Sequence, residues 1–235
     1  MLEAGGQDKN LFIDMPAGYS QLVPKANPSN YGYETAVEPN VGSRRMYWPR
    51  GRGWGGSSSI NAMVYIRGHA TDYDQWAQAG NAGWSYAEVL PYFKRAESLE
   101  GDGDDGYHGY DGPLSVKKSD RRDDILLGRF IEAGQQAGFA LTDDFNGRQQ
   151  EGFSRYEHTM KGARRCSAAK AYLHPAKDRP NLTIVSHTSV NRIMITNRRA
   201  SAIDALVKGQ KETFVARKEV VLCAGALNSP QILLR

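Results

Sequence analysis

Residues 51–68 read GRGWGGSSSINAMVYIRG, and four of the first six positions are glycine. Glycine adopts positive φ angles at little steric cost and lets the backbone approach a ligand closely, so this stretch predicts a binding loop. Its first six letters also match the GxGxxG pattern of dinucleotide-binding folds. That pattern should follow an apolar strand, whereas the residues before Gly51 are Tyr47-Trp48-Pro49-Arg50. We therefore do not assign the first turn of a Rossmann fold to this loop.

Two serines after the glycines indicate the start of a helix. Ser57 and Ser58 can each cap that helix by accepting a hydrogen bond from its first turn. The free N–H groups of the first turn would then face a polar or anionic ligand. The alternative is an ordinary helix-capping turn that binds nothing.

The whole stretch resembles the first signature of the glucose–methanol–choline (GMC) oxidoreductase family. It has a Gly-Arg pair, two adjacent glycines, two serines, an asparagine three residues after the second serine, and then an aromatic residue and a glycine. Asp74 stands where the signature has a polar residue. The resemblance implies an FAD cofactor, and it implies that the following residues bind it: Gly55, Gly56, Ser57, Asn61, Ala62, Met63 and Val64.

The same resemblance says what to expect at three further positions. Glu3 is similar to the acid that ends the second strand of Rossmann flavoproteins and binds the adenosine ribose; a surface glutamate is the alternative. Val190 matches a position whose backbone reaches the adenine, and a core valine is the alternative. Ile60 stands where some family members carry a histidine bonded to the flavin, so we expect FAD to bind noncovalently.

The resemblance implies an α/β fold, mixed α+β in this chain, with a partial Rossmann-type FAD-binding region and part of a substrate domain. We expect residues 1–235 to be an incomplete N-terminal region of a longer enzyme. In it, residues from about 1 to 115 would form the flavin-binding excursion and helices, about 116 to 175 a substrate-side insertion, and about 176 to 235 strands that return to the FAD domain. The first dinucleotide loop and the catalytic half would lie outside this chain, so no catalytic residue is named.

Local patterns predict helices at several places, and three of them have clear N-cap residues. Ser85 and Glu88 form a capping box, with serine at the N-cap and glutamate three residues later. Asp124 can cap a helix that carries an apolar stripe at 3.6-residue spacing. Thr71 can cap a helix that runs to Ala79.

Residues 181–224 predict a change to short strands. The last, Val220–Leu222, is a continuous apolar run that predicts a buried strand, and we assign Cys223 beside it to the core. The other expected strands are Leu182–Val185, Val190–Ile195, Ala202–Val207 and Thr213–Val215.

Charge and composition disfavour several classes of site. The net charge is +4, but the basic residues are scattered, so nucleic-acid binding is not supported. The five histidines are not at metal-ligand spacings, so no metal is expected, and each histidine is assigned to the surface or a loop. No apolar run approaches the roughly 20 residues of a membrane helix. We expect a protein of the cytoplasm or peripheral at the inner membrane, and membrane association is left open.

The function that the resemblance implies is oxidation of a primary alcohol by hydride transfer to FAD, so the expected partner is a small alcohol. Residues 120–235 most resemble choline dehydrogenases. The segment from Tyr47 to His69 is equally similar to medium-chain aliphatic alcohol dehydrogenases, which remain an alternative. A second alternative is a remnant or binding protein without catalysis. We expect this chain alone to be inactive, and the sequence does not identify the electron acceptor.

Overall fold

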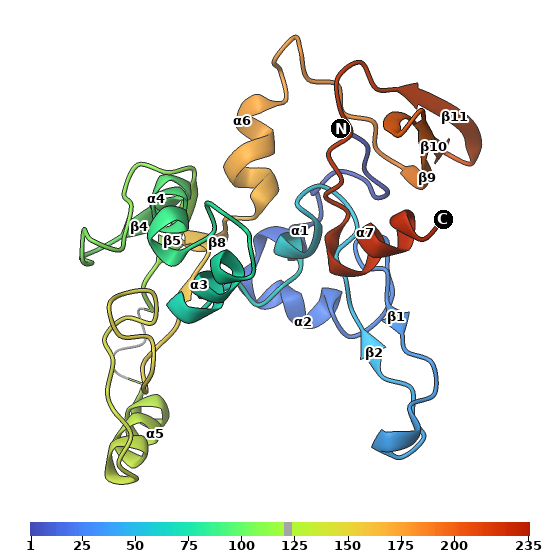
Figure 1. Cartoon of the computed structure of the whole chain (residues 1–235). Coiled ribbons are helices and arrows are strands. Elements are labelled where there is room, and N and C mark those ends of the chain that lie inside the picture. Colours follow the sequence, from blue (N-terminus) through green and yellow to red (C-terminus); the bar gives the residue numbers. More distant parts are fainter. Residues whose placement is uncertain (120–123) are drawn as a thin grey trace. The chain divides into compact units, whose positions relative to one another are not determined.

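The structure is a computed structural model that describes residues 1–119 and 124–235 (Figure 1). The chain divides into two compact units. The first unit comprises Met1–Lys9, Leu22–Ile60 and Pro175–Arg235, and the second comprises Asn10–Gln21 and Asn61–His174. Helices and strands occur in both units, as expected for a mixed α+β chain. The expected division near residues 115 and 175 concerns a longer enzyme and stays a prediction.

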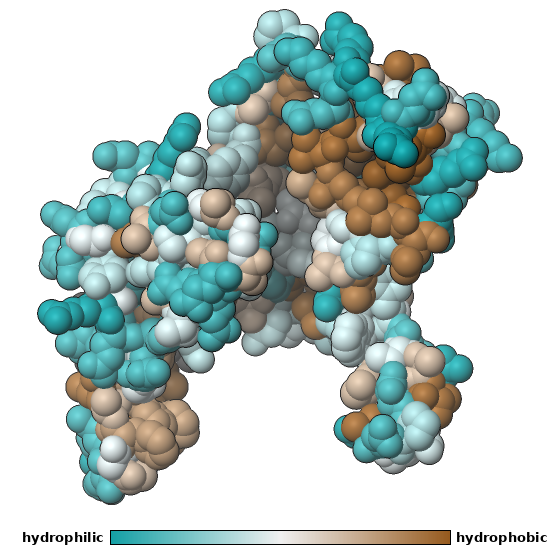
Figure 2. Space-filling model, viewed as in Figure 1, coloured by the Kyte–Doolittle hydropathy of each residue, from teal (hydrophilic) through white to brown (hydrophobic). Residues whose placement is uncertain are grey.

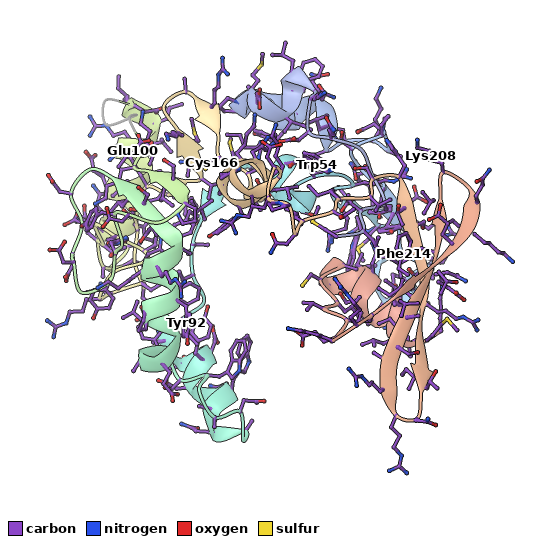
Figure 3. The ribbon with its side chains drawn as sticks, turned by 90° about the horizontal axis from the view of Figure 1, so that it is seen from above. Trp54, Tyr92, Glu100, Cys166, Lys208 and Phe214 are labelled. Atoms are coloured by element: carbon purple, nitrogen blue, oxygen red, sulfur yellow. The ribbon has the colours of Figure 1, made fainter. Side chains whose placement is uncertain are left out.

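An antiparallel three-stranded sheet is the main strand structure of the first unit. Its strands are β9 (Thr188–Thr196), β10 (Arg199–Val207) and β11 (Gln210–Val215), in the order β11-β10-β9. Each hairpin turns through two residues with positive φ, as tight two-residue turns require. Lys208 lies at one of these turns, and Phe214 lies on β11 (Figure 3). Three of the expected strands are therefore confirmed, each longer than predicted at its start.

Shorter elements make up the rest of the first unit. Leu2 forms a parallel bridge to Val185, so the expected strand near Val185 is reduced to that bridge. The final helix begins at Gly225, where φ is 85°. The bounds of these elements are β1 Tyr33–Glu34, η2 Pro39–Val41, β2 Tyr47–Trp48, η3 Gly56–Ser59 and α7 Gly225–Leu233.

Residues 220–222 do not form the buried strand that their apolar run predicted. Val221 is 74% exposed, and Cys223 is exposed too. Among the described residues no strand pairs with this segment, and an extended segment without a pairing neighbour has no hydrogen-bond ladder to hold it. Figure 2 shows apolar side chains gathered at the surface around α7 and the β9–β11 sheet. The exposed apolar residues of this region include Ile195, Val215, Val221, Leu233 and Leu234.

The second unit is built around a four-stranded sheet in the order β3-β6-β5-β4. Only β4 and β5 are parallel, and the β3–β6 and β5–β6 pairs are antiparallel. Val116 on β5 has no exposed surface and lies in the core. The strands are β3 Val64–Tyr65, β4 Glu97–Glu100, β5 Leu114–Lys117 and β6 Glu157–His158.

Caps begin the longer helices of the second unit. The Ser85–Glu88 capping box precedes α4 (Tyr86–Ala96), as predicted. Asp124 caps α5 (Ile125–Gln136) by accepting two backbone N–H groups, also as predicted. Before α3 (Ala70–Gln78), however, the N-cap is His69 and not Thr71. The imidazole Nδ1 accepts the N–H of Thr71, a role that a sequence search for serine, threonine, aspartate or asparagine overlooks.

The remaining short elements complete the chain. The antiparallel pair β7 and β8 holds Arg164 and Arg165. Within the described residues, no helix is both long and apolar enough to cross a membrane. The bounds are α1 Leu11–Asp14, η1 Pro16–Gly18, α2 Tyr19–Leu22, β7 Met160–Lys161, β8 Arg164–Arg165, the π-helical turn η4 Ala169–Leu173 and α6 His174–Ala176.

Candidate functional site

Glu3 joins the start of the chain to the glycine loop. Its backbone N–H donates to Val185 O at 3.0 Å, which holds the segment extended. Its Oε1 accepts the N–H groups of Gly5 and Gly53, each at 2.8 Å. Within the described residues no hydrogen bond reaches Oε2. One carboxylate oxygen therefore shapes the loop, and the other is available to a ligand hydroxyl.

Close backbone contacts explain three of the glycines. A Cβ on Gly5 would lie 2.5 Å from Gly53 N, and a Cβ on Gly51 would lie 2.2 Å from Gly56 O. Gly53 has a φ of 130° and its Cβ would lie 2.9 Å from Gly6 O. Side chains at Gly5 or Gly53 would push the loop away from the chain start, and a side chain at Gly51 would open the loop itself.

Gly56 is a glycine for a different reason. Its φ is 53°, and a Cβ there would meet no atom within 4 Å. The neighbouring Gly55 also has a left-handed φ, 87°. Within the described chain, the N–H groups of Gly55 and Ser57, on either side of Gly56, donate to no acceptor. The loop thus presents open space and two free donors at the glycine pair.

The serines do not cap a helix as predicted. The turn that follows is the short 3₁₀ helix η3, whose N-cap is Gly55 without a side-chain bond. Ser57 Oγ instead accepts Gly51 N–H at 3.0 Å, and Ser58 Oγ donates to Gly55 O at 2.6 Å. The hydroxyls turn back because the loop before them is folded onto itself. They brace the glycine loop and leave its free N–H groups uncovered.

The second half of the signature lies in the second unit. Asn61 Oδ1 accepts the N–H of Met63 at 3.1 Å and closes a tight turn. Met63 is 4% exposed and has a φ of 64°, a conformation that side chains other than glycine seldom adopt. Ala62 and Val64, on either side of it, are exposed. The turn therefore buries Met63 and presents its two neighbours.

Val190 lies near the start of β9, opposite Ala205 of β10. A register shift follows at Asn191, where the ladder is locally broken. Within the described strands β9 is an edge of its sheet, so part of its backbone has no strand partner. Val190 is half-buried, which agrees with either the adenine contact or the core alternative.

A buried ionic cluster in the second unit was missed by the sequence reasoning. His108, assigned to the surface or a loop, is 1% exposed. Its Nδ1 faces both oxygens of Glu97 at 3.1 Å, and its Nε2 faces Asp144 Oδ2 at 2.6 Å. Burial opposes the charge on the ring, but hydrogen bonds to Asp144 and Glu97 outweigh it and raise the pKa of His108 to about 9. The ring is therefore a cation between two carboxylates. A sequence pattern could not show this, because the three residues come from separate segments.

Two further groups complete this cluster. The first is Arg67, whose guanidinium contacts Glu97 Oε2 at 2.8 Å. The second is Glu157, whose pKa is raised by burial. Glu97, His108 and Glu157 are close enough together to hold a metal ion. Both ring nitrogens already face carboxylates, however, and Arg67 supplies a positive charge beside Glu97. The geometry is that of a structural ion cluster, in which Arg67 and His108 lie among the carboxylates of Glu97, Asp144 and Glu157.

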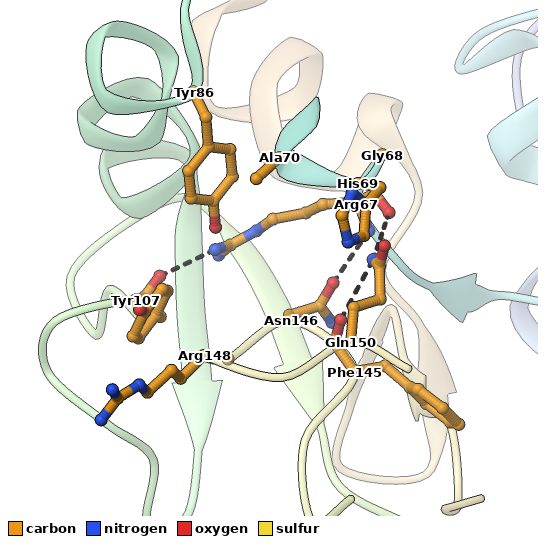
Figure 4. A pocket seen from close by; sticks show the side chains of 11 residues that line it. Arg67, Gly68, His69, Ala70, Tyr86, Tyr107, Phe145, Asn146, Arg148 and Gln150 are labelled. Carbon is orange, nitrogen blue, oxygen red and sulfur yellow. Dashed lines mark hydrogen bonds between the residues drawn. The ribbon is translucent and has the colours of Figure 1, made fainter. Parts of the chain in front are cut away.

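A cavity of about 220 Å³ lies next to Arg67 (Figure 4). Arg67 Nη1 donates to Tyr107 O at 2.8 Å along its wall. Asn146 Oδ1 accepts Arg67 N–H at 2.8 Å, so the wall is tied together by its own residues. None of the residues expected to bind the cofactor lines this cavity.

A family model described as GMC oxidoreductase matches residues 30–235. Among curated proteins, the chain is 47% identical to an oxygen-dependent choline dehydrogenase of Sinorhizobium fredii and 44% identical to one of Brucella ovis. Each match covers 100% of this chain and 42% of the relative. The chain thus spans less than half the length of these relatives.

Solved structures show the same fold. The chain matches pyridoxine 4-oxidase from Mesorbium loti with a TM-score of 0.91 and 32% identity, over 99% of this chain and 45% of that one. It matches an FAD-dependent oxidoreductase from Chaetomium thermophilum with a TM-score of 0.88 and 25% identity, over 99% of this chain and 42% of that one. These matches extend through both units of the chain.

Proposed function

This chain belongs to the GMC oxidoreductase family, and we propose that it carries part of the FAD site of an enzyme that oxidises alcohols. The observation that carries the proposal is the loop at Gly56. Gly56 has a left-handed conformation and open space beside it, and a free N–H donor lies on either side. A cofactor can therefore approach the backbone closely at this loop. Several relatives and structural matches bear names of flavin-dependent or choline-oxidising enzymes.

We assign each of these residues of the first unit to one part of FAD. Glu3 has one oxygen engaged by Gly5 and Gly53, and it would use the other to accept a hydroxyl of the adenosine ribose. The backbone at Gly55, Gly56 and Ser57 would approach the pyrophosphate or the flavin ring, and Val190 would contact the adenine.

The family signature also gives the turn of Asn61, Ala62, Met63 and Val64 a role in binding the flavin. FAD supplies the hydride acceptor when bound, and the chain's own residues hold and orient it. Ile60 has no nucleophilic nitrogen, so the flavin would be held by noncovalent contacts alone. We assign no catalytic base to any described residue, and we propose that this chain by itself has no alcohol dehydrogenase activity.

The relatives favour a choline-like primary alcohol as the substrate class. The curated proteins named above are choline dehydrogenases, and their similarity extends over all of this chain. Medium-chain aliphatic alcohols remain the alternative within the same family.

Cofactor binding is tested by titrating the purified chain with FAD and, separately, with FMN, while following flavin fluorescence. Glu3 and Val190 would contact only the adenosine half, which FMN lacks. One hydrogen bond to a charged group corresponds to roughly 10- to 150-fold in affinity, so FAD should bind at least about tenfold more tightly than FMN. Equal affinities would contradict the roles of Glu3 and Val190, and no saturable binding of either flavin would contradict the proposal itself.

A further inference from the structure

We propose that Arg165 is the positioning residue for the turn from Asn61 to Val64, holding it in the shape that meets the flavin without touching the cofactor. The part of this inference that concerns the flavin rests on the proposed function. The part that concerns the turn rests on contacts within the second unit alone.

Arg165 bonds to both polar oxygens of Asn61. Its Nη1 donates to Asn61 O at 2.7 Å and to Asn61 Oδ1 at 2.8 Å. Its Nε donates to Ile13 O at 2.8 Å, which fixes the guanidinium against α1. The residue is 2% exposed. One rigid, planar group therefore sets both the backbone and the side chain of Asn61.

The same Asn61 oxygen closes the turn. Oδ1 accepts the N–H of Met63 as well as Nη1 of Arg165, so the two bonds share one acceptor. On the far side of the turn, Met63 O accepts the N–H of Thr159 at 2.8 Å. Met63 is thus held from both sides in its left-handed conformation, which a side chain of this size adopts only when its surroundings enforce it.

Burying a guanidinium is unfavourable, and burial lowers the pKa of Arg165 to about 10. The group still carries its charge at neutral pH. Ordinary cross-linking of two loops could be achieved by a neutral side chain, whereas a charged donor bonds more strongly to the carbonyl and amide oxygens of Asn61. Ala62 and Val64 are exposed on either side of Met63, so the angle of the turn decides in which direction their side chains and backbone groups point.

The first test measures the turn without FAD, by amide hydrogen exchange of the 235-residue chain. Arg165→Met keeps a long side chain but removes all donors, and Arg165→Lys keeps the charge but not the planar fork. We expect exchange at Met63 and Thr159 to rise about tenfold or more in Arg165→Met and less in Arg165→Lys, while the amides of the β9–β11 sheet stay unchanged.

Two controls separate positioning from general loss of stability. Arg164→Met makes the same change at the exposed neighbouring residue, and Val116→Ala destabilises the core of the same unit without removing a hydrogen bond to Asn61 or Met63. Neither should expose Met63 selectively. If Val116→Ala raises exchange at Met63 and Thr159 as much as Arg165→Met does, or if folded Arg165→Met protects them as the parent does, the inference is wrong.

A second pair of variants avoids removing the arginine, in case Arg165→Met does not fold. Asn61→Asp keeps an oxygen for both Arg165 and the Met63 N–H, whereas Asn61→Leu removes it. We expect Asn61→Asp to retain the protection of the Met63 amide from exchange and Asn61→Leu to lose it. Equal protection in the two variants would overturn the inference.

The flavin arm uses the same variants with FAD, reading affinity and the visible circular dichroism of the bound flavin. Arg165→Met should change the flavin spectrum, Arg165→Lys should restore it in part, and the two controls should leave it as in the parent. An unchanged spectrum with exposed Met63 would show that the turn does not meet the flavin. If the parent binds no FAD, the proposed function fails while the exchange result still decides the role of Arg165 in the turn.

Discussion

Glu3 Oε1 and the backbone N–H of Gly53 are hydrogen-bonded at 2.8 Å across 50 positions of sequence. The bond ties the first residues of the chain to the loop that carries the family signature. The proposed contact of Glu3 with the ribose would use Oε2, a different oxygen from Oε1, which shapes the loop.

Glu3→Ala should therefore weaken both the fold of the first unit and the binding of FAD. Loss of a bond to a charged group typically costs about 1.5–3 kcal/mol, equivalent to roughly 10- to 150-fold in affinity. Glu3→Gln keeps an acceptor oxygen for Gly53, so it should recover most of the stability. Chemical denaturation and FAD titration of both variants measure the two effects. A Glu3→Ala chain as stable as the parent would show that the Gly53 bond contributes little.

Gly56→Val should abolish FAD binding while leaving the chain folded. A Cβ at Gly56 meets no protein atom within 4 Å, so the protein itself offers no clash and the side chain would occupy ligand space. The left-handed φ should cost about 1–2 kcal/mol of stability. The loss of FAD affinity in Gly56→Val should exceed the loss in Glu3→Ala. The energy of one hydrogen bond limits the effect of Glu3→Ala, whereas a steric block has no such limit.

Gly42→Val is the matched control for this experiment. Gly42 belongs to the same unit, has a φ of 75° and likewise has open space where a Cβ would lie. It should lose similar stability and bind FAD as the parent does. If both variants bind FAD normally once circular dichroism shows that they are folded, the glycine loop does not hold the cofactor.

His108 should make the second unit less stable as the pH rises. Its pKa is raised from 6.5 in the unfolded chain to about 9 in the folded one, so the stabilisation is complete below pH 6.5 and is lost as the pH passes 9. Thermal unfolding followed between these pH values should show a falling midpoint. His108→Gln should be less stable at pH 6.5 and should lack this dependence. A parent midpoint that does not fall over this range would contradict a charged His108.

The flavin should separate from the protein when the complex is denatured. Ile60 is 3% exposed and offers no atom that could form a covalent bond to the flavin. Acid precipitation of the FAD-saturated chain should leave the yellow colour in the supernatant. Flavin fluorescence that stays with the denatured protein band would show a linkage through another residue.

The sequence alone predicted features whose causes are local. The Ser85–Glu88 box and the Asp124 cap were confirmed because each depends on residues within one helical turn. The strands that became β9, β10 and β11 were confirmed because alternating patterns and tight turns are also local. Residues 51–68 were enough to indicate the family. The same reasoning failed at Val220–Leu222, since an apolar run predicts a buried strand only if a neighbouring strand pairs with it.

Only the tertiary structure decided which distant groups meet. Ser57 was expected to cap a helix, but its hydroxyl accepts from Gly51 because the glycine loop folds back on itself. His108 read as an ordinary histidine until the fold placed Glu97 and Asp144 at its two nitrogens. Arg165 lies 104 positions from Asn61, and nothing near either residue in the sequence indicates the contact. Hydrogen bonds at such separations depend on the path of the whole chain, whereas caps, turns and alternation depend on neighbours a few residues apart.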